Sequence, residues 1–358
     1  MVTHWLDSRL TLPGSPRMAQ VYAYFVNVGT NGVLLFFVIS GFVITRATMQ
    51  RELDLFRLSY GLFYLRRLAR IGPLFIAVCA IGIVLLNIPA EPTALRDYVV
   101  RNPAAVFDAA FWVSLFSFTF NFWRMANAGI ASGWGLHWDG MWSLAVEEQF
   151  YVAFPLLLLL AKTRRRLVLA LSVLILFSVV YHLARLQSVS PYDSVIGFQL
   201  IASGMLVAVL SPALASGRGR WALYGGLLLC AGFLAPLGSL LLLLKPECIA
   251  AGASLLLCCV ASVPHERPVP WLRPLARVGE LSYGLYLLHP LVLYLLGTTL
   301  SGLGTVVGYG CFVVATAGLA ELSSRFYEQP AERFVRSWLK KPAKSVRRRA
   351  GALIGAPD

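Results

Sequence analysis

Apolar residues fall in long runs, and the charged residues gather in short clusters between them. Ten such runs lie at about residues 29–47, 72–88, 104–122, 142–161, 167–185, 193–211, 221–243, 247–263, 281–300 and 304–324. Each approaches the roughly 20 residues that an α-helix needs to cross the hydrocarbon of a bilayer. A helix of this length satisfies its own backbone hydrogen bonds in lipid. The pattern therefore predicts an all-α, polytopic membrane helical bundle.

The composition agrees with one membrane domain. The 358 residues are 58% hydrophobic and 13% charged, with a mean hydropathy of +0.70. We expect a membrane domain over residues 1–324 and a basic cytoplasmic tail over residues 325–358. The net charge of +14 is spread over clusters between apolar runs, which is typical of cytoplasmic loops. This favours a lipid bilayer with anionic headgroups as the counter-charge and no nucleic acid. The six cysteines lie in or beside apolar runs without metal-ligand spacing, so no metal site is expected.

The basic clusters predict which runs cross the membrane. The five clusters are Arg46 to Arg70, Lys162 to Arg166, Arg218 with Arg220, Arg267 to Arg277, and Arg325 to Arg349. If every run crossed, the second cluster would face the opposite side from the first, against the positive-inside rule. The run 104–122 contains Asp108, Asn121 and several hydroxyl side chains, so we predict that it is re-entrant or interfacial. All five clusters then face the cytoplasm.

The remaining spans begin with one that enters from the outside, although residues 1–20 show no signal-peptide pattern. The simplest explanation is that the stretch MVTHWL (residues 1–6) is the outer end of a first helix that begins upstream of Met1. We therefore expect about ten transmembrane helices in the full-length form, with the first truncated here and both termini inside. The upstream reading frame is expected to encode the rest of that helix.

Four stretches combine polar chemistry with membrane depth. They are LFFVISGFVITR (35–46), YLRRLARIGP (64–73), MWSLAVEEQFYVAFP (141–155) and LSYGLYLLHPLV (281–292). Together they resemble the membrane-bound acyltransferase-3 family of bacterial integral membrane O-acyltransferases, and FYEQPAERF (326–334) is similar to the family's C-terminal ending.

The resemblance implies an enzyme of the bacterial inner membrane, with its C-terminus in the cytoplasm. It would transfer an acyl group, often acetyl, to a hydroxyl of a cell-envelope glycan or related acceptor. Acyl-CoA would be the donor co-substrate, and no cofactor would be bound.

The stretch at 141–155 places a carboxylate in an apolar run. Ser143, Glu147 and Tyr151 follow at i, i+4 and i+8 along one helix face, whereas Glu148 points about 100° away. A charge in the bilayer costs on the order of a few kcal/mol, so such residues are functional by default. We interpret Glu147 as catalytic and Ser143 and Tyr151 as substrate-binding. Alternatively, Glu147 is a structural carboxylate paired with an arginine. Glu148 fits either role, and it could hold the helix against its neighbours.

The stretch at 281–292 carries a second polar stripe. Ser282, Tyr286 and His289 lie at i, i+4 and i+7, and Pro290 perturbs the helix at that level. A polar stripe inside a bundle forms a cavity wall, so we expect these three residues to position a substrate. The alternative is a histidine satisfied by a backbone carbonyl.

Arg66, Arg67 and Arg70 have two interpretations. They belong to a positive-inside cluster, which alone would explain them. They also suit recognition of the CoA phosphates, because guanidinium binds phosphate in a bidentate manner. Arg66 and Arg70 lie one helical turn apart and can face one ligand.

His4 matches a histidine that the family has late in its first helix. Acyl transfer to a hydroxyl needs a general base within hydrogen-bond reach. The resemblance implies that His4 is this base, supported by Glu147, and that a partner arginine would precede Met1. A histidine near a chain end is otherwise usually solvated. Direct transfer and a covalent acyl-histidine intermediate both remain open.

We interpret the other polar residues in the apolar runs and loops as structural or as lying away from the reaction. Ser40 and Gly41 are small mid-helix residues, for which close helix packing is the main interpretation. His137 and Asp139 lie in a predicted outer loop and could touch a sugar. His182 is interpreted as structural or solvated.

Two other classes of protein remain possible. A transporter or exporter of acyl groups would also place ionisable residues in the membrane. However, we find no internal repeat and no matched pair of broken helices. A non-catalytic member of the family is the other alternative.

Overall fold

The computed structural model describes residues 16–51, 55–86, 108–127, 138, 140–185, 190, 192–211, 218–234, 243–261, 273–303 and 305–340. These residues form helices and contain no strand. Five of the described helices are long and apolar enough to cross a membrane, within Gly29–Gln50, Tyr60–Leu85, Met141–Ala161, Arg164–Ala184 and Val306–Val335. The predicted all-α membrane bundle is confirmed.

Each of the nine predicted spanning runs overlaps a helix, although residues 235–242 of the run 221–243 lie outside the described residues. These helices are α2 (Pro16–Arg51), α3 (Tyr60–Leu86), α9 (Met141–Ala161), α10 (Arg164–Ala184), α11 (Ser194–Leu210), α12 (Arg218–Phe233), α14 (Lys245–Ala261), α15 (Arg273–Ser301) and α16 (Thr305–Ser323). A short 3₁₀ turn, η1 (Leu55–Arg57), precedes α3. A π-helical turn, Ser324–Glu328, joins α16 to α17 (Gln329–Lys340).

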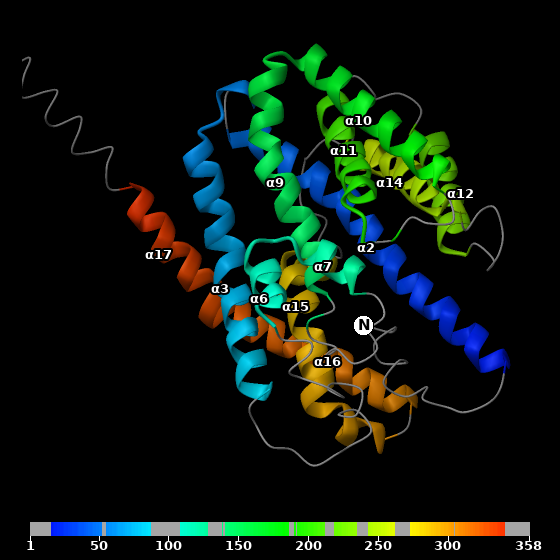
Figure 1. The fold of residues 1–358 in the computed structure, drawn as a ribbon, viewed down its shortest axis with the longest axis vertical. Coiled ribbons are helices and arrows are strands. Elements are labelled where there is room, and N and C mark those ends of the chain that lie inside the picture. The colour runs from blue at the N-terminus through cyan, green and yellow to red at the C-terminus, as the bar shows by residue number, and fades with distance from the viewer. Residues whose placement is uncertain are drawn as a thin grey trace, which may run out of the picture.

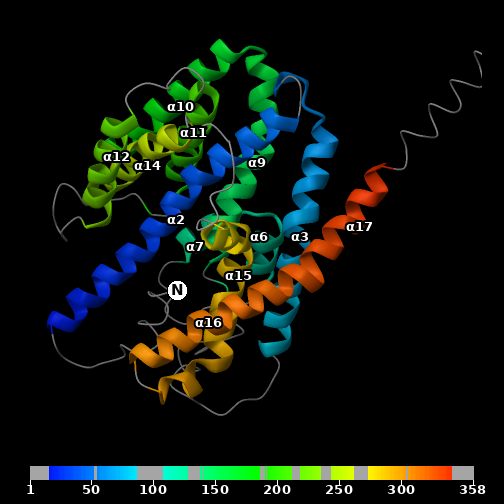
Figure 2. The same cartoon turned by 180° about the vertical axis from the view of Figure 1, so that it is seen from behind.

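The bundle has two groups of helices with α2 and α9 between them. On one side, α10, α11, α12 and α14 pack together, and on the other lie α3, α15, α16 and α17 (Figure 1). Seen from behind, α2 runs diagonally past both groups (Figure 2). The largest part of the core joins α2, α3, α9 and α11. This arrangement brings α2, α3 and α9 together around the most polar part of the core.

The run at 104–122 was predicted not to span the membrane, and the structure confirms that it does not form one spanning helix. It contains α6 (Ala109–Phe116) and the start of α7 (Phe120–Ala126), separated by a turn at Phe118 with a φ of 54°. At 1.5 Å per residue, the eight residues of α6 extend about 12 Å, well short of the roughly 30 Å hydrocarbon core. Asp108 caps α6 by accepting a hydrogen bond from the Phe111 amide at 2.8 Å.

A buried hydrogen-bond network fixes α6 and α7 to the bundle. The Asn121 side chain is fully buried and donates to Ser194 Oγ at 2.9 Å. Gln149 Nε2 on α9 donates to Asn121 Oδ1 at 2.8 Å and to the Phe118 carbonyl at 2.7 Å. Because buried polar groups are costly unless paired, these bonds hold the short helix pair at one position beside α9 and α11.

Glycines allow α2 and α11 to cross closely. A Cβ built on Gly41 would lie 1.9 Å from the Ile201 carbonyl oxygen, and one on Gly204 would lie 1.9 Å from the Val38 carbonyl oxygen. Only a residue without a side chain permits this backbone approach. The predicted packing role is therefore confirmed for Gly41.

Two arginine contacts agree with the predicted charge pattern, and a third joins two neighbouring helices. Arg46 of α2 donates to Ser211 Oγ at 3.1 Å, and Arg164 of α10 donates to the Val209 carbonyl, so both reach the end of α11. Arg277 of α15 lies 2.9 Å from Glu321 of α16. The basic clusters that contain Arg46 and Arg164 therefore lie at the same end of the bundle, as predicted. The Arg277 ion pair joins the start of α15 to the end of α16.

Several helices begin earlier than predicted: α2 begins at Pro16 rather than near residue 29, and α15 at Arg273 rather than near residue 281. α3 begins at Tyr60 rather than near residue 72, so all three arginines of the YLRRLARIGP stretch lie on the helix. After α16, the chain continues through the π-helical turn into α17, which packs along α3. Tyr327 of the turn donates to the Pro73 carbonyl at 3.1 Å.

Candidate active site

A buried carboxylate and two hydroxyls meet where α2 and α9 pack together. Glu147 Oε1 accepts hydrogen bonds from Ser40 Oγ and from Tyr151 OH, and the two hydroxyl oxygens are 2.6 Å apart. All three side chains are buried. Among the described residues, no donor contacts the other carboxylate oxygen, Oε2. The cluster therefore has one carboxylate oxygen held in place and one available to a further donor.

Arg67 connects this cluster to α3. Its guanidinium carbon lies 4.0 Å from the centre of the Tyr151 ring, a cation–π contact. Arg67 is also near enough to Glu148 to interact electrostatically with it. The site thus combines two carboxylates, a phenol and a guanidinium at membrane depth.

Glu148 faces a different part of the bundle from Glu147. Its Oε1 is buried and accepts no hydrogen bond within the described part of the chain. Tyr283 of α15 lies on the same side and donates to the Ile71 carbonyl at 2.8 Å. The two adjacent glutamates therefore have distinct surroundings, as their helix faces predict.

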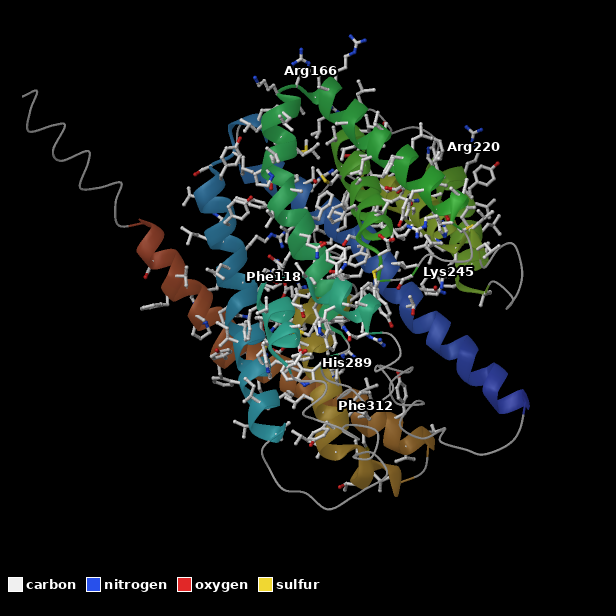
Figure 3. The ribbon with its side chains drawn as sticks, in the orientation of Figure 1. Phe118, Arg166, Arg220, Lys245, His289 and Phe312 are labelled. Atoms are coloured by element: carbon white, nitrogen blue, oxygen red, sulfur yellow. The ribbon has the colours of Figure 1, made fainter. Side chains whose placement is uncertain are left out.

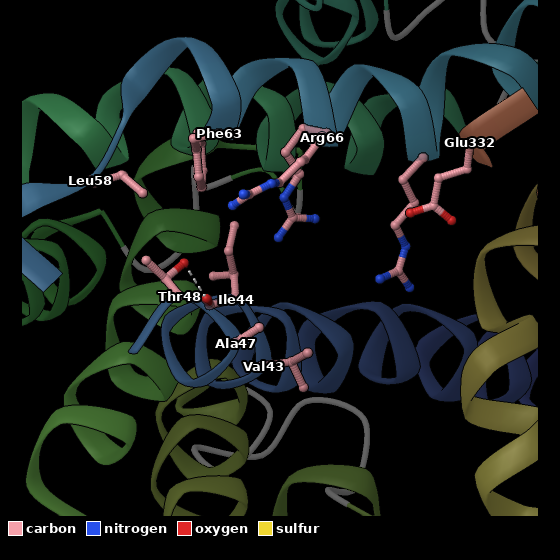
Figure 4. A pocket seen from close by; sticks show the side chains of 10 residues that line it. Val43, Ile44, Ala47, Thr48, Leu58, Phe63, Arg66 and Glu332 are labelled. Carbon is pink, nitrogen blue, oxygen red and sulfur yellow. Dashed lines mark hydrogen bonds between the residues drawn. The ribbon is translucent and has the colours of Figure 1, made fainter. Parts of the chain in front are cut away.

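Arg66, Arg67 and Arg70 line one pocket of about 90 Å³ between α2 and α3. Figure 4 shows Arg66 extending from α3 toward α2, with Glu332 of α17 at the far end of the pocket. Val43 and Ile44, which form part of its wall, lie one turn beyond Ser40 on α2. Because Arg67 belongs to both, the pocket and the Glu147 cluster form one continuous site.

The N-terminal part of the polar stripe on α9 meets α15 instead. Ser143 Oγ lies 2.5 Å from Tyr286 OH, and both hydroxyls contact the Gly140 carbonyl. The His289 ring centre lies 5.9 Å from that of Tyr286, and its Nδ1 lies 3.0 Å from the Leu285 carbonyl. Ser282 makes no hydrogen bond to the residues that the structure describes. The stripe predicted on α9 therefore divides: Ser143 contacts Tyr286 of the stripe predicted on α15, whereas Glu147 and Tyr151 contact Ser40 of α2.

Some predicted residues fall elsewhere. His4, His137 and Asp139 lie outside the described residues. His182 is buried and its Nδ1 contacts Glu247 Oε1 at 2.8 Å. No group of three histidine, cysteine, aspartate or glutamate side chains in the described part is placed to hold a metal ion.

Sequence reasoning undervalued one member of the site. Ser40 was expected mainly to pack, yet its hydroxyl binds Glu147 and Tyr151. A hydroxyl next to Gly41 at mid-helix was the available signal, because a buried hydroxyl requires a partner.

The fold and the site define a polytopic helical membrane protein with a buried carboxylate cluster beside an arginine-lined pocket. The family described as an acyltransferase domain, Acyl_transf_3, matches residues 1–322. The chain belongs to this family, and the resemblance carried by its motifs is confirmed.

Relatives with curated names support the same family. The chain is 28% identical over 334 residues to the putative peptidoglycan O-acetyltransferase YrhL of Bacillus subtilis, covering 85% of this chain and 50% of that protein. It is 26% identical over 335 residues to the O-acetyltransferase OatA of Staphylococcus aureus, covering 86% and 53%. It is 29% identical over 321 residues to nodulation protein 10 of Rhizobium leguminosarum, covering 84% and 81%. The chain thus spans about half the length of the first two relatives. No solved structure matches it.

Proposed function

We propose that this chain is an integral membrane O-acyltransferase that moves an acyl group from acyl-CoA to a hydroxyl of a cell-envelope glycan. Two relatives are named as O-acetyltransferases, one of them of peptidoglycan. The observation that carries the proposal is the continuity between the arginine pocket and the buried Glu147 cluster through Arg67.

The donor would enter at the arginines. Three guanidinium groups on one helix suit the phosphates of CoA, because each charge-assisted hydrogen bond contributes about 1.5–3 kcal/mol. The enclosed volume of about 90 Å³ is smaller than the roughly 300–1,000 Å³ of complete small-molecule pockets. In this conformation, only one end of the donor would be enclosed, and the rest would lie outside the pocket. The thioester would then approach Ser40, which lies one turn before Val43 on α2, and Glu147, which accepts a hydrogen bond from Ser40.

The acceptor would approach from the other polar group. Ser143 precedes Glu147 by one turn of α9, about 6 Å along the helix axis. Ser143, Tyr286 and His289 would bind hydroxyls of the acceptor at this level. The two substrates would therefore meet near Glu147 from opposite ends of one polar stripe.

In the reaction, the acceptor oxygen forms a bond to the acyl carbon as the carbon–sulfur bond breaks, and the leaving thiolate takes up a proton. A general base must accept the hydroxyl proton. We propose His4 for this role, with Glu147 Oε2 binding the imidazole and Ser40 and Tyr151 orienting the carboxylate.

The test is transfer of radiolabelled acetyl groups from acetyl-CoA in membranes that contain the protein. We expect label in an alkali-labile ester of the glycan fraction. Replacing both Arg66 and Arg70 by alanine should raise the apparent KM for acetyl-CoA roughly tenfold or more, with a smaller change in the acceptor KM.

The matched control replaces Arg165 and Arg166, two exposed arginines at the start of α10, by alanine. It removes the same two positive charges from a basic cluster that does not line the pocket. An unchanged KM for acetyl-CoA in the Arg66 and Arg70 variant would assign that cluster to membrane topology alone. Absence of labelled glycan ester with any acyl-CoA would refute the proposed function.

A further inference from the structure

A third helix contributes an acidic side chain to the arginine pocket between α2 and α3. Glu332 of α17 is the one carboxylate among the described residues that line this pocket, whose basic residues are Arg66, Arg67 and Arg70. Figure 4 shows Glu332 pointing from α17 into the space between α2 and α3, into which Arg66 also extends. The donor proposed for this pocket binds through its phosphates, so Glu332 carries the same sign of charge as the ligand.

The pocket arginines need a counter-charge when no phosphate is bound. Arg166 extends outward from the end of the bundle, where water and salt screen its charge (Figure 3). Arg66 and Arg67 are instead half-buried and share an enclosed space of about 90 Å³. Like charges in such a space repel each other with less screening, and a carboxylate beside them reduces this repulsion. Glu332 therefore stabilises the ligand-free pocket.

A second carboxylate on the same segment has different surroundings. Glu328, one turn before Glu332, accepts a hydrogen bond from Ser323 Oγ at 2.8 Å across the π-helical turn. Glu328 interacts electrostatically with Arg70, but it is not among the lining residues of the pocket. Glu332 is therefore the carboxylate of this segment that a ligand entering the pocket would meet.

The packing of α17 allows it to move without disturbing the rest of the bundle. α17 packs chiefly against α3 and against the π-helical turn that joins it to α16. Phe334 on α17 is 64% exposed, so only part of the helix surface is held. Single π-helical turns are frequent at functional sites. A shift of α17 away from α3 would withdraw Glu332 and enlarge the space beside the arginines.

We propose that Glu332 competes with the donor for the arginine pocket. In the ligand-free protein, its carboxylate is the counter-anion of the arginines, and a phosphate of the donor displaces it as α17 moves outward. Glu332 thereby sets the affinity for the donor without contacting the reacting atoms. This inference rests on the proposed function for the identity of the donor.

The opposite role for Glu332 would be to orient the arginines for the phosphates. The two roles differ in sign. Removal of a competing carboxylate strengthens binding of the donor, whereas removal of an orienting carboxylate weakens it.

The experiment is equilibrium binding of radiolabelled coenzyme A to the purified full chain, without an acceptor. Glu332→Gln keeps the shape of the side chain and removes its charge. The apparent affinity falls with the fraction of molecules that are competent to bind, so the dissociation constant of this variant should be roughly tenfold lower if about one pocket in ten is open in the wild type. Glu280→Gln is the control, because it makes the same change at an exposed carboxylate that pairs with Arg277. The control should bind as the wild type does.

A second variant separates contact from net charge. Glu332→Asp keeps the charge but shortens the side chain by one methylene group, so its dissociation constant should lie between those of the wild type and Glu332→Gln. Binding of Glu332→Asp equal to that of the wild type would overturn the competition, because net charge alone would then explain the effect of Glu332→Gln.

An unchanged or higher dissociation constant in Glu332→Gln would also overturn the inference, as would a failure of both wild type and variant to bind coenzyme A. The measurement needs no acyl transfer. Tighter binding in Glu332→Gln without formation of any glycan ester would therefore refute the proposed function and support the competition.

Discussion

Replacing Glu147 by glutamine should separate catalysis from stability. The carboxylate accepts hydrogen bonds from Ser40 and Tyr151 in a buried site. Glutamine keeps the shape and one carbonyl acceptor, but it removes the charge. We expect a strong loss of acyl transfer with normal insertion and little change in thermal stability.

The magnitude follows from the two hydrogen bonds. A hydrogen bond to a charged group contributes about 1.5–3 kcal/mol and a neutral one about 0.5–1.5 kcal/mol. Replacing the carboxylate by an amide therefore weakens each bond by about 1–1.5 kcal/mol, or about 2–3 kcal/mol for the two bonds together. If this loss falls on the transition state, the rate decreases by about 30- to 150-fold. Loss of the interaction with a general base would reduce it further, since such catalysis contributes about 10²–10⁴-fold.

Stability should change little, because two effects oppose each other. The weaker hydrogen bonds from Ser40 and Tyr151 destabilise the folded protein, whereas the amide avoids much of the cost of a buried carboxylate, which is on the order of a few kcal/mol. The melting temperature of Glu147→Gln should therefore stay close to that of the wild type. A large decrease would indicate that the charge is needed for folding.

The assay measures acetyl transfer in membranes with matched protein levels, together with thermal unfolding of the purified variants. Glu148→Gln is the matched control, because it makes the same chemical change one residue further along α9, where Oε1 has no described partner. We expect it to reduce activity less. Equal losses in the two variants, or full activity in Glu147→Gln, would refute the assignment by helix face.

Two further predictions concern packing and the acceptor. Gly41→Ala should lower the melting temperature and the yield of folded protein, because its Cβ would meet the Ile201 carbonyl oxygen at 1.9 Å; Gly32→Ala, with nothing within 4 Å of its Cβ, is the control. Tyr286→Phe removes the hydroxyl that contacts Ser143 and Gly140, so it should raise the acceptor KM severalfold with the acetyl-CoA KM unchanged. Tyr60→Phe, at the exposed start of α3, controls for the loss of a phenol, and a selective change in the acetyl-CoA KM of Tyr286→Phe would contradict the acceptor role.

The helices were predictable because hydrophobic length is a local property. The residues of each run alone determine its transfer free energy into lipid, so nine spans could be located without knowing their neighbours. The interruption at residues 104–122 was also visible, because polar side chains such as Asn121 are expensive in lipid unless buried in protein. The start of α3 was placed too late because Arg66, Arg67 and Arg70 lower the local hydropathy without breaking the helix.

The site was only partly predictable. Helical periodicity places Glu147 and Tyr151 on one face, but it does not identify the helix that covers that face. The Ser40 hydroxyl comes from 107 residues earlier in the chain, and Tyr286 meets Ser143 across 143 residues. These pairings depend on helix crossings set by packing, such as the contact of Gly41 with Ile201. The same limit applies to Glu247, whose contact with His182 depends on the packing of α10 against α14.

Ser40 and Gly41 are consecutive residues, and this adjacency constrains any attempt to redesign the enzyme. Gly41 is held against the backbone of α11, so Ser40 cannot retreat from Glu147 unless the two helices separate. Under the proposed function, space for a longer acyl group cannot be gained by trimming this side of the pocket, because glycine has nothing to remove. The adjustable positions are Phe63 of α3 and Val43 of α2, which line the arginine pocket with removable side-chain volume. A library aimed at donor chain length should therefore vary those two positions and leave the Ser-Gly pair intact.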